Sequence, residues 1–436
     1  MKQFLRSGLQ RWPYSVVSVI TALAAFGAYT SMYAFRKAFS AATFEGIHYL
    51  NVDYKVWLVI FQVIGYTCSK FYGIRFIAGV DSSKRGSTIL FLIGIAWLAL
   101  LFFALVPAPW NIIFLFANGF PLGMIWGLVF GYLEGRRATE FMAAVMSVSL
   151  IFASGFVKTV GRILLANFHV SEYWMPFLTG LLFAGPLLAF TAILESLPPP
   201  SEQDIQLRTE RKPMTATDRK VFIHRFLPGI VLTLIIYILL TVTRDLRDNF
   251  EVEIWNDLGI KDVHIYTTID SLISIGVLVA LSLLILIKNN FSAFKVIHIM
   301  IIGGCILTGV STLLFYLHQI NGIAWMSLAG LGLYMGYIPY NAIFFERMIA
   351  TYQCKGNVGF IMYIADAAGY LGSVTVLLFK EFGGTSSISW RQLFQQSLTC
   401  IAVVGGIAAI CSLAFFVHKK KMKSSDIQIT VQVEQV

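Results

Sequence analysis

The stretch YAFRKAF, Tyr33 to Phe39, closes an apolar run that begins near Tyr14 and places two adjacent cations, Arg36 and Lys37, at its far end. At a rise of about 1.5 Å per residue, Arg36 lies roughly 33 Å along a helix that starts at Tyr14. A hydrocarbon core is about 30 Å thick, and a cation at membrane depth costs about 2.5 to 3.5 kcal/mol unless it is paired or hydrated. Two explanations fit: an anion site that faces a polar cavity, or two basic side chains that reach water at a helix end.

The composition around this stretch is that of a polytopic membrane protein. Of 436 residues, 57% are hydrophobic and only 13% charged, and the mean hydropathy is +0.74; helices are the simplest structures that satisfy every backbone polar group in lipid. The net charge of +10 does not indicate nucleic acid, because the cations gather in short segments between apolar runs. The five cysteines include no C-x-x-C pair, so we expect no disulfide or metal framework. No Walker A sequence occurs, which argues against ATP-driven pumping, and no cofactor is expected.

Apolar runs between polar breaks predict an all-α integral membrane fold of twelve transmembrane helices in two halves of six. The spans of the first half, residues 1–196, are expected at 14–39, 54–78, 88–106, 110–133, 139–166 and 173–196. Those of the second half, residues 226–418, are expected at 226–250, 264–288, 293–318, 321–348, 355–382 and 391–418. The polar stretch 197–225, which opens with three prolines, is interpreted as a cytoplasmic linker. Residues 419–436 are expected to form a cytoplasmic tail.

The distribution of charge predicts that both termini are cytoplasmic. With the N-terminus inside, the inner segments hold most of the cations, including Lys84, Arg85, Arg136, Arg137 and the basic linker. The outer loops carry acids instead: Glu45, Asp53, Glu251, Glu253, Asp257 and Asp262. This asymmetry follows the positive-inside rule. We therefore expect a multi-pass protein of the cytoplasmic (inner) membrane, with the first helix retained, and a monomer in the lipid bilayer.

The two halves resemble copies of one unit. Corresponding features are separated by 208, 212 and 214 residues, in the pairs Arg36 and Arg244, Glu134 and Glu346, and Gly155 and Gly369. Nearly constant offsets are expected of a duplicated six-helix unit with small changes in its loops. A pair of such halves is the architecture of the major facilitator superfamily, in which the substrate site lies near the midplane between the halves.

The seventh span ends in LLTVTRDLRDNF, which holds four charges: Arg244, Asp245, Arg247 and Asp248. Helical spacing puts Arg244 on one face with Arg247 and Asp248, and the internal repeat puts it opposite Arg36. Two guanidinium groups that face each other across a low-dielectric cavity repel, and an anion between them removes that cost; the planar fork of Arg suits phosphate or carboxylate. We expect Asp245 or Asp248 to hold a neighbouring cation or to exchange a proton. The alternative is a solvated helix end with internal ion pairs.

Other candidates lie deep in later spans. Lys158 in the fifth span is predicted to face the cavity, and Asp366 in the eleventh is predicted to pair with Arg244 or to carry a proton, since an acid at that depth is usually functional or paired. Asp270 is similar but lies closer to a span end. Aromatic residues that either line the cavity or pack are Tyr33, Trp126, Tyr337 and Tyr340. Glycines at four-residue spacing predict close helix packing in the fourth span: Gly119, Gly123, Gly127 and Gly131.

Two motifs in the first two spans resemble those of the organophosphate:phosphate antiporter family of the major facilitator superfamily. RKAF, from Arg36 to Phe39, is similar to the family's RKNF-like motif, and YTCSKF, from Tyr66 to Phe71, is similar to its Y-x-x-SKF motif. Arg244 matches the family's second phosphate-contacting Arg. The resemblance implies that Arg36 and Arg244 clasp a phosphate, with Lys37 and Lys70 as accessory cations. The chain departs from the family in its loop GVDSSKRG, which keeps Gly79 and Asp81 without the adjacent Arg. It also lacks the family's His in the fifth span, where it offers Lys158 nearby.

The sequence therefore predicts a secondary transporter that moves a small anionic, phosphorylated solute by alternating access, with inorganic phosphate or protons as coupling species. One alternative is proton-coupled transport of a neutral or cationic solute, in which the arginines pair internally with the acids. Another is a transporter-like receptor that binds an anion without moving it. An enzyme is not expected, because no set of nucleophile, base and orienting group is visible.

Overall fold

The computed structural model describes residues 12–199, 204, 216–352, 358–383 and 388–433, and these residues form a helical bundle. The bundle begins with α2, whose 24 residues are Tyr14–Lys37 and whose last turn carries Arg36 and Lys37. A 3-10 turn, η1 (Ala38–Ala41), continues it. The other elements of the first half are β1 (His48–Tyr49), β2 (Val52–Asp53), α3 (Tyr54–Gly79), η2 (Ser82–Lys84), α4 (Arg85–Leu105), η3 (Trp110–Ile112), α5 (Ile113–Leu122), α6 (Ile125–Phe130), α7 (Thr139–Ala166) and α8 (Met175–Glu195).

The second half starts with the longest helix, α10 (Ala216–Asp257), in which non-helical angles at Phe250 mark a kink. A π-helical turn, η4 (Tyr340–Phe344), interrupts the tenth span, and a second, η5 (Ile401–Gly405), interrupts the twelfth. The remaining helices are α11 (Ile265–Ile285), α12 (Asn290–Tyr316), α13 (Gly322–Pro339), α14 (Phe345–Tyr352), α15 (Val358–Phe382), α16 (Trp390–Cys400) and α17 (Gly406–Val433).

Nine helical segments of the described chain are long and apolar enough to cross a membrane. The helices α3, α13 and α15 complete the bundle at three further predicted spans, and they are less apolar because they carry lysines, an aspartate or several glycines toward the interior. The fold is thus the expected all-α membrane architecture of twelve spans. The length and hydropathy of the apolar runs determine this architecture, because each predicted run is close to the 20 residues that a helix needs to cross a bilayer.

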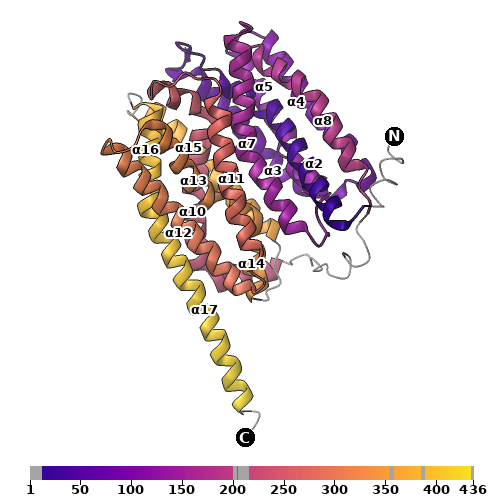
Figure 1. The fold of residues 1–436 in the computed structure, drawn as a ribbon, viewed down its shortest axis with the longest axis vertical. Helices are drawn as coiled ribbons and strands as arrows, with labels where there is room; N and C mark the ends of the chain where they lie inside the picture. Colours follow the sequence, from indigo (N-terminus) through magenta and orange to yellow (C-terminus); the bar gives the residue numbers. More distant parts are fainter. Residues whose placement is uncertain (1–11, 200–203, 205–215, 353–357, 384–387, 434–436) are drawn as a thin grey trace.

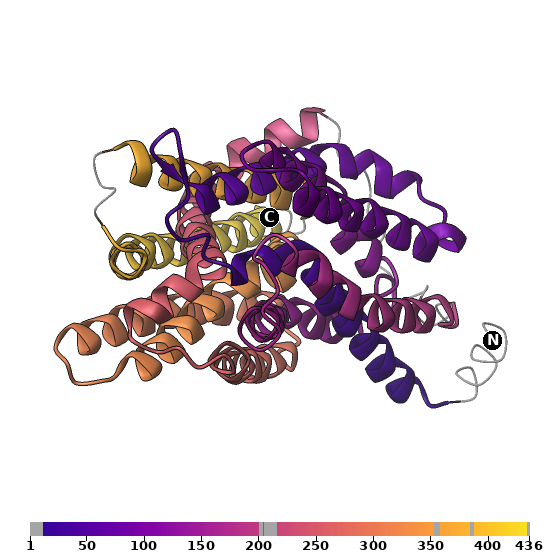
Figure 2. The same ribbon diagram turned by 90° about the horizontal axis from the view of Figure 1, so that it is seen from above.

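The two halves lie side by side in both views of the ribbon (Figures 1 and 2). The first half packs chiefly through α2 against α7 and α8, and through α5 against α3 and α4. Between the halves, α7 packs along α11 and α3 packs on α15. At the first of these contacts a Cβ on Gly155 would collide with the backbone carbonyl of Tyr266, so α7 and α11 approach as closely as their backbones allow.

The bundle has two distinct ends. At one, β1 and β2 pair antiparallel, with His48 opposite Asp53; we refer to it as the hairpin end. The other, the linker end, holds the start of α2, the loop between α6 and α7, and the chain that leaves α8 (Figure 1). Most of the predicted linker, 197–225, lies outside the described residues. The predicted assignment of the linker end to the cytoplasm remains a prediction.

Two segments differ from expectation. The seventh span was predicted to end at residue 250, with Glu251 and Glu253 in an outer loop, but α10 continues to Asp257. Glu251 is buried and Glu253 is half-buried there, because lysines and an arginine neutralise them. The segment expected to form a tail is helical as far as Val433, and α17 projects beyond the bundle at the linker end (Figure 1).

Candidate functional site

A cavity lies between the halves, lined by residues of α2, α3, α6 and α7 on one side and of α10, α13, η4, α14 and α15 on the other. The space open to the centre of a water molecule is about 200 Å³. Six of the ten predicted site residues line it: Tyr33, Arg36, Lys70, Arg244, Asp248 and Asp366. The other four lie behind its wall, in ion pairs with their neighbours: Lys37, Lys158, Asp245 and Arg247.

Arg36 is the cation of this cavity that has no carboxylate partner in the described chain. Its guanidinium carbon lies 3.9 Å from the ring centroid of Tyr66 and 5.7 Å from that of Tyr33. The side chain is 7% exposed, and its Nε has no hydrogen-bond partner. Stacking on aromatic faces compensates part of the cost of burying a cation. The rest of this burial cost is not compensated, so the position beside Arg36 favours an anion.

The backbone at Arg36 is held by amide side chains from two neighbouring helices. The Gln62 Nε2 donates to the Arg36 carbonyl at 2.5 Å and to the Asn118 Oδ1 at 2.9 Å. The Asn118 Nδ2 donates to the carbonyls of Phe35 and Ala96, each at 2.9 Å. Because α2 ends at Lys37, the carbonyls of Phe35 and Arg36 belong to its last turn, where the helix leaves oxygens without intrahelical partners, whereas the carbonyl of Ala96 belongs to α4. The two amides satisfy some of them and fix the position of Arg36.

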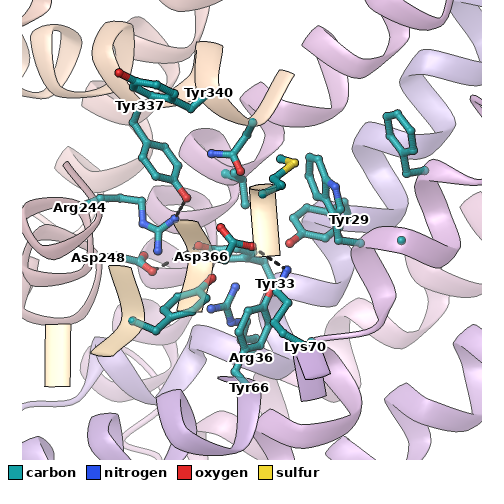
Figure 3. A pocket seen from close by; sticks show the side chains of 18 of the residues that line it. Tyr29, Tyr33, Arg36, Tyr66, Lys70, Arg244, Asp248, Tyr337, Tyr340 and Asp366 are labelled. Atoms are coloured by element: carbon teal, nitrogen blue, oxygen red, sulfur yellow. Dashed lines mark hydrogen bonds and ion pairs between the residues drawn. The ribbon is translucent and has the colours of Figure 1, made fainter. Parts of the chain in front are cut away.

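Arg244 faces the same cavity from the second half (Figure 3). Its Nε and Nη2 donate to the Asp245 Oδ1 at 3.1 and 2.5 Å, and its Nη1 donates to the Tyr337 hydroxyl. The Ser373 hydroxyl donates to the other oxygen of Asp245 at 2.7 Å. Arg244 is therefore held by its own neighbour in sequence, and it differs from Arg36 in being already paired.

Asp366 bridges the halves across the cavity. Its Oδ2 lies 3.2 Å from the Lys70 Nζ, and its Oδ1 accepts a hydrogen bond of 2.5 Å from the Tyr237 hydroxyl. Figure 3 shows Asp366 between the side chains of the first half and those around Arg244. The expected pairing of Asp366 with Arg244 is replaced in this structure by pairing with Lys70.

Asp248 joins the cavity to a buried cluster toward the hairpin end. It accepts from the Tyr33 hydroxyl at 3.2 Å and from the Ser154 hydroxyl at 2.5 Å, and it lies 3.4 Å from both Lys37 and Lys158. These four partners belong to α2 and α7, whereas Asp248 belongs to α10. One carboxylate of the second half therefore holds two helices of the first.

The cluster continues through Glu251, which the sequence had assigned to an outer loop. Lys158 also pairs with Glu251 at 2.9 Å, and Arg247 pairs with Glu251 at 3.2 Å and with Asp270 at 2.6 Å. The sequence did carry a signal for Glu251, which lies three and four residues after Asp248 and Arg247 and is flanked by apolar residues at helical spacing. A further pair, Lys55 with Glu253 at 2.5 Å, links the halves nearer the hairpin end.

Among the described residues, Arg36 is the one unpaired charge of the eleven in this cluster. Six cations (Arg36, Lys37, Lys70, Lys158, Arg244 and Arg247) lie near five carboxylates (Asp245, Asp248, Glu251, Asp270 and Asp366), and every one of the eleven except Arg36 has an opposite charge within 4 Å. A further carboxylate, Glu346, also lines the cavity. Asp81, in the loop that departs from the antiporter pattern, has no part in this cluster: it accepts from the Ser83 backbone N–H at 3.2 Å, and that bond lowers its pKa.

Comparisons with known proteins agree with the fold. A family model described as "Family of unknown function (DUF5690)" matches residues 38–419. No curated protein matches the chain. Among solved structures, the crystal structure of a D-xylose-proton symporter is similar, with a TM-score of 0.60 and 14% sequence identity over 92% of this chain and 97% of that one. The architecture is therefore the major facilitator fold; at this identity the likeness shows the fold alone.

Proposed function

The chain belongs to the family of unknown function DUF5690 and has the major facilitator fold, and from this premise we propose that it is a secondary transporter of a small anionic, phosphorylated solute. The observation that carries the proposal is Arg36: a buried cation without a carboxylate partner, in a cavity between two halves, next to ten other charges that are all paired. An anion at this position supplies the opposite charge that Arg36 lacks, and a cation or a neutral solute does not.

Arg244 is the second cation of the proposed site. It lies 4.5 Å from the ring centroid of Tyr337, and its pairing with Asp245 uses one edge of the guanidinium. An arriving anion competes with Asp245 for this group, so binding at Arg36 draws Arg244 toward the centre of the cavity. Lys70 takes part in the same way, exchanging Asp366 for the anion.

Alternating access follows from the same contacts. Lys70 and Asp366 connect α3 to α15, and Lys37, Lys158 and Asp248 connect the halves toward the hairpin end. An anion that competes for Lys70 weakens the first connection and leaves the second intact. In the exchange form of the proposal, inorganic phosphate restores the charge balance on the return step; in the symport form, Asp366 or Asp248 carries a proton.

The test is uptake of radiolabelled phosphate and sugar phosphates by proteoliposomes, with D-xylose as an uncharged comparison. Arg36→Gln is expected to abolish anion uptake and also anion-dependent thermal stabilisation, which at about 100-fold excess over Kd amounts to about 2.7 kcal/mol for the unmodified protein. Arg162→Gln is the control, because Arg162 does not line the cavity. Anion binding that survives Arg36→Gln would refute the anion site, and uptake of D-xylose alone would replace it with sugar transport.

A further inference from the structure

The cavity extends from Arg36 between walls that are largely aromatic. Ten of its 23 lining residues are Tyr, Trp or Phe, against 14% in the whole chain, so the enrichment is a property of this cavity. On one side α6 contributes Trp126 and Phe130, and on the other the tenth span contributes Tyr340 and Phe345. Indole and phenyl faces of this kind accept flat rings in stacked or edge-on contact.

Some of these rings already have a cationic partner and others do not. Arg36 stacks on Tyr66, and Arg244 stacks on Tyr337. In the described chain no cation stacks on Trp126, which is half-buried and meets Tyr29 edge-on at a centroid distance of 5.0 Å. The first group of rings stabilises the arginines, whereas Trp126 keeps a face for another partner.

A hydrogen-bond donor without a partner lies on the opposite wall. Asn341 lines the cavity, and its Nδ2 is buried with no acceptor among the described residues. It belongs to the π-helical turn η4, which follows Pro339 and also contributes Tyr340 to the cavity. Short π-helical turns are frequent at functional sites, and a buried amide donor without an acceptor is costly unless a ligand or water satisfies it.

We propose that the transported anion carries a flat aromatic or heteroaromatic ring, with its anionic group at Arg36, its ring against Trp126 and an acceptor atom on the ring facing Asn341. This inference rests on the proposed anion site and narrows its substrate class. An anion with a saturated chain or a sugar ring meets the same charge at Arg36, but it has no flat face to stack on the indole of Trp126.

The experiment measures Kd by calorimetry on the purified full-length protein for four phosphate esters that differ only in the body: phenyl, cyclohexyl and butyl phosphate, and glucose 6-phosphate. Phenyl phosphate is expected to bind about three- to tenfold more tightly than cyclohexyl phosphate, the range given by an aromatic pair. Trp126→Leu is expected to reduce that ratio to about one. Trp110→Leu, at an exposed tryptophan outside the cavity, is expected to preserve it.

A second variant, Asn341→Leu, tests the proposal independently of Trp126. 4-Acetylphenyl phosphate offers a carbonyl acceptor and is expected to gain about five-fold over phenyl phosphate in the unmodified protein, and Asn341→Leu is expected to remove that gain. Equal Kd values for all esters, or tightest binding of glucose 6-phosphate, would overturn the ring proposal while leaving the anion site in place. Failure of every ester and of inorganic phosphate to bind would overturn both.

Discussion

Arg36 and Arg247 are both buried, yet removal of their charges is expected to affect stability in opposite ways. Arg247 is fully buried between Asp270 and Glu251, and Arg247→Gln leaves the buried Asp270 without its cation, whereas Glu251 keeps Lys158. Removing one partner of a buried ion pair costs about 3 to 5 kcal/mol. A fall in the melting temperature of the ligand-free protein would show this.

Arg36→Gln is expected to leave the melting temperature of the ligand-free protein equal or higher. The variant loses contacts with two tyrosine rings, but it also removes a buried cation that no carboxylate neutralises, and desolvating an unpaired charge costs more than a cation–π contact returns. A large destabilisation would mean that Arg36 has a structural role, and the anion site would lose its main support.

Asp248→Asn is expected to destabilise the protein because it leaves Lys37 and Lys158 near a neutral amide. The cost should again be about 3 kcal/mol or more. Lys158 keeps Glu251 in this variant, whereas Lys37 loses its carboxylate, so adding Lys37→Met to Asp248→Asn removes the unpaired cation and is expected to recover part of the loss. Denaturation of the single and double variants in one detergent measures the coupling, and simple additivity of the two changes would exclude the proposed interaction.

At the scale of elements, the close contact of α3 and α5 depends on glycine. A Cβ on Gly119 would collide with the backbone carbonyl of Gln62, the residue that holds the Arg36 backbone. Gly119→Ala is expected to cost about 1 to 3 kcal/mol, as overpacking usually does, and to weaken anion binding by displacing Gln62. Gly94→Ala is the matched control, since a Cβ there has no atom within 4 Å. Equal melting temperatures for the two variants would contradict this packing argument.

Most helices could be predicted from the sequence, because a run of about 20 apolar residues has few alternatives in a membrane. The end of α10 could not. Glu251 and Glu253 have the composition of a loop. Their pairing with Lys158 and Lys55, residues about 90 and 200 positions away, lets them continue the helix away from water. Apolar patterns carry no information about such distant partners.

The candidate site, too, could be predicted only in part from the sequence. The internal repeat and the RKAF and YTCSKF motifs indicated Arg36, Lys70 and Arg244 as site residues, and all three line one cavity. The sequence could not assign partners: Asp366 pairs with Lys70, and Asp245 pairs with Arg244. Choosing among carboxylates on neighbouring helices requires knowing which helix faces which, and that is set by packing across the halves.

At the scale of the whole molecule, the halves are joined by buried ion pairs toward the hairpin end. Lys55→Met breaks the outermost of them by removing the partner of Glu253. Because Lys55 also donates to the Ser40 carbonyl, we expect this variant to shift the population toward a state that is open at the hairpin end.

The shift is measurable by thiol labelling. In a cysteine-free background, Ser40→Cys should react faster with a membrane-impermeant maleimide when Lys55→Met is present, since Ser40 is fully buried in this structure. Lys288→Met, at a lysine that joins none of these pairs, serves as the control. An unchanged labelling rate in Lys55→Met would indicate that the pair does not hold the halves together.

The twelfth span has a practical consequence for imaging. Since α17 runs without interruption from Gly406 to Val433 and leaves the bundle at the linker end, its 28 residues extend about 42 Å at the usual helical rise. A soluble domain fused in helical phase with this end would be carried outside the detergent belt at a set orientation. Such a fiducial mark would supply the asymmetric feature that electron cryomicroscopy needs to align images of a particle this small.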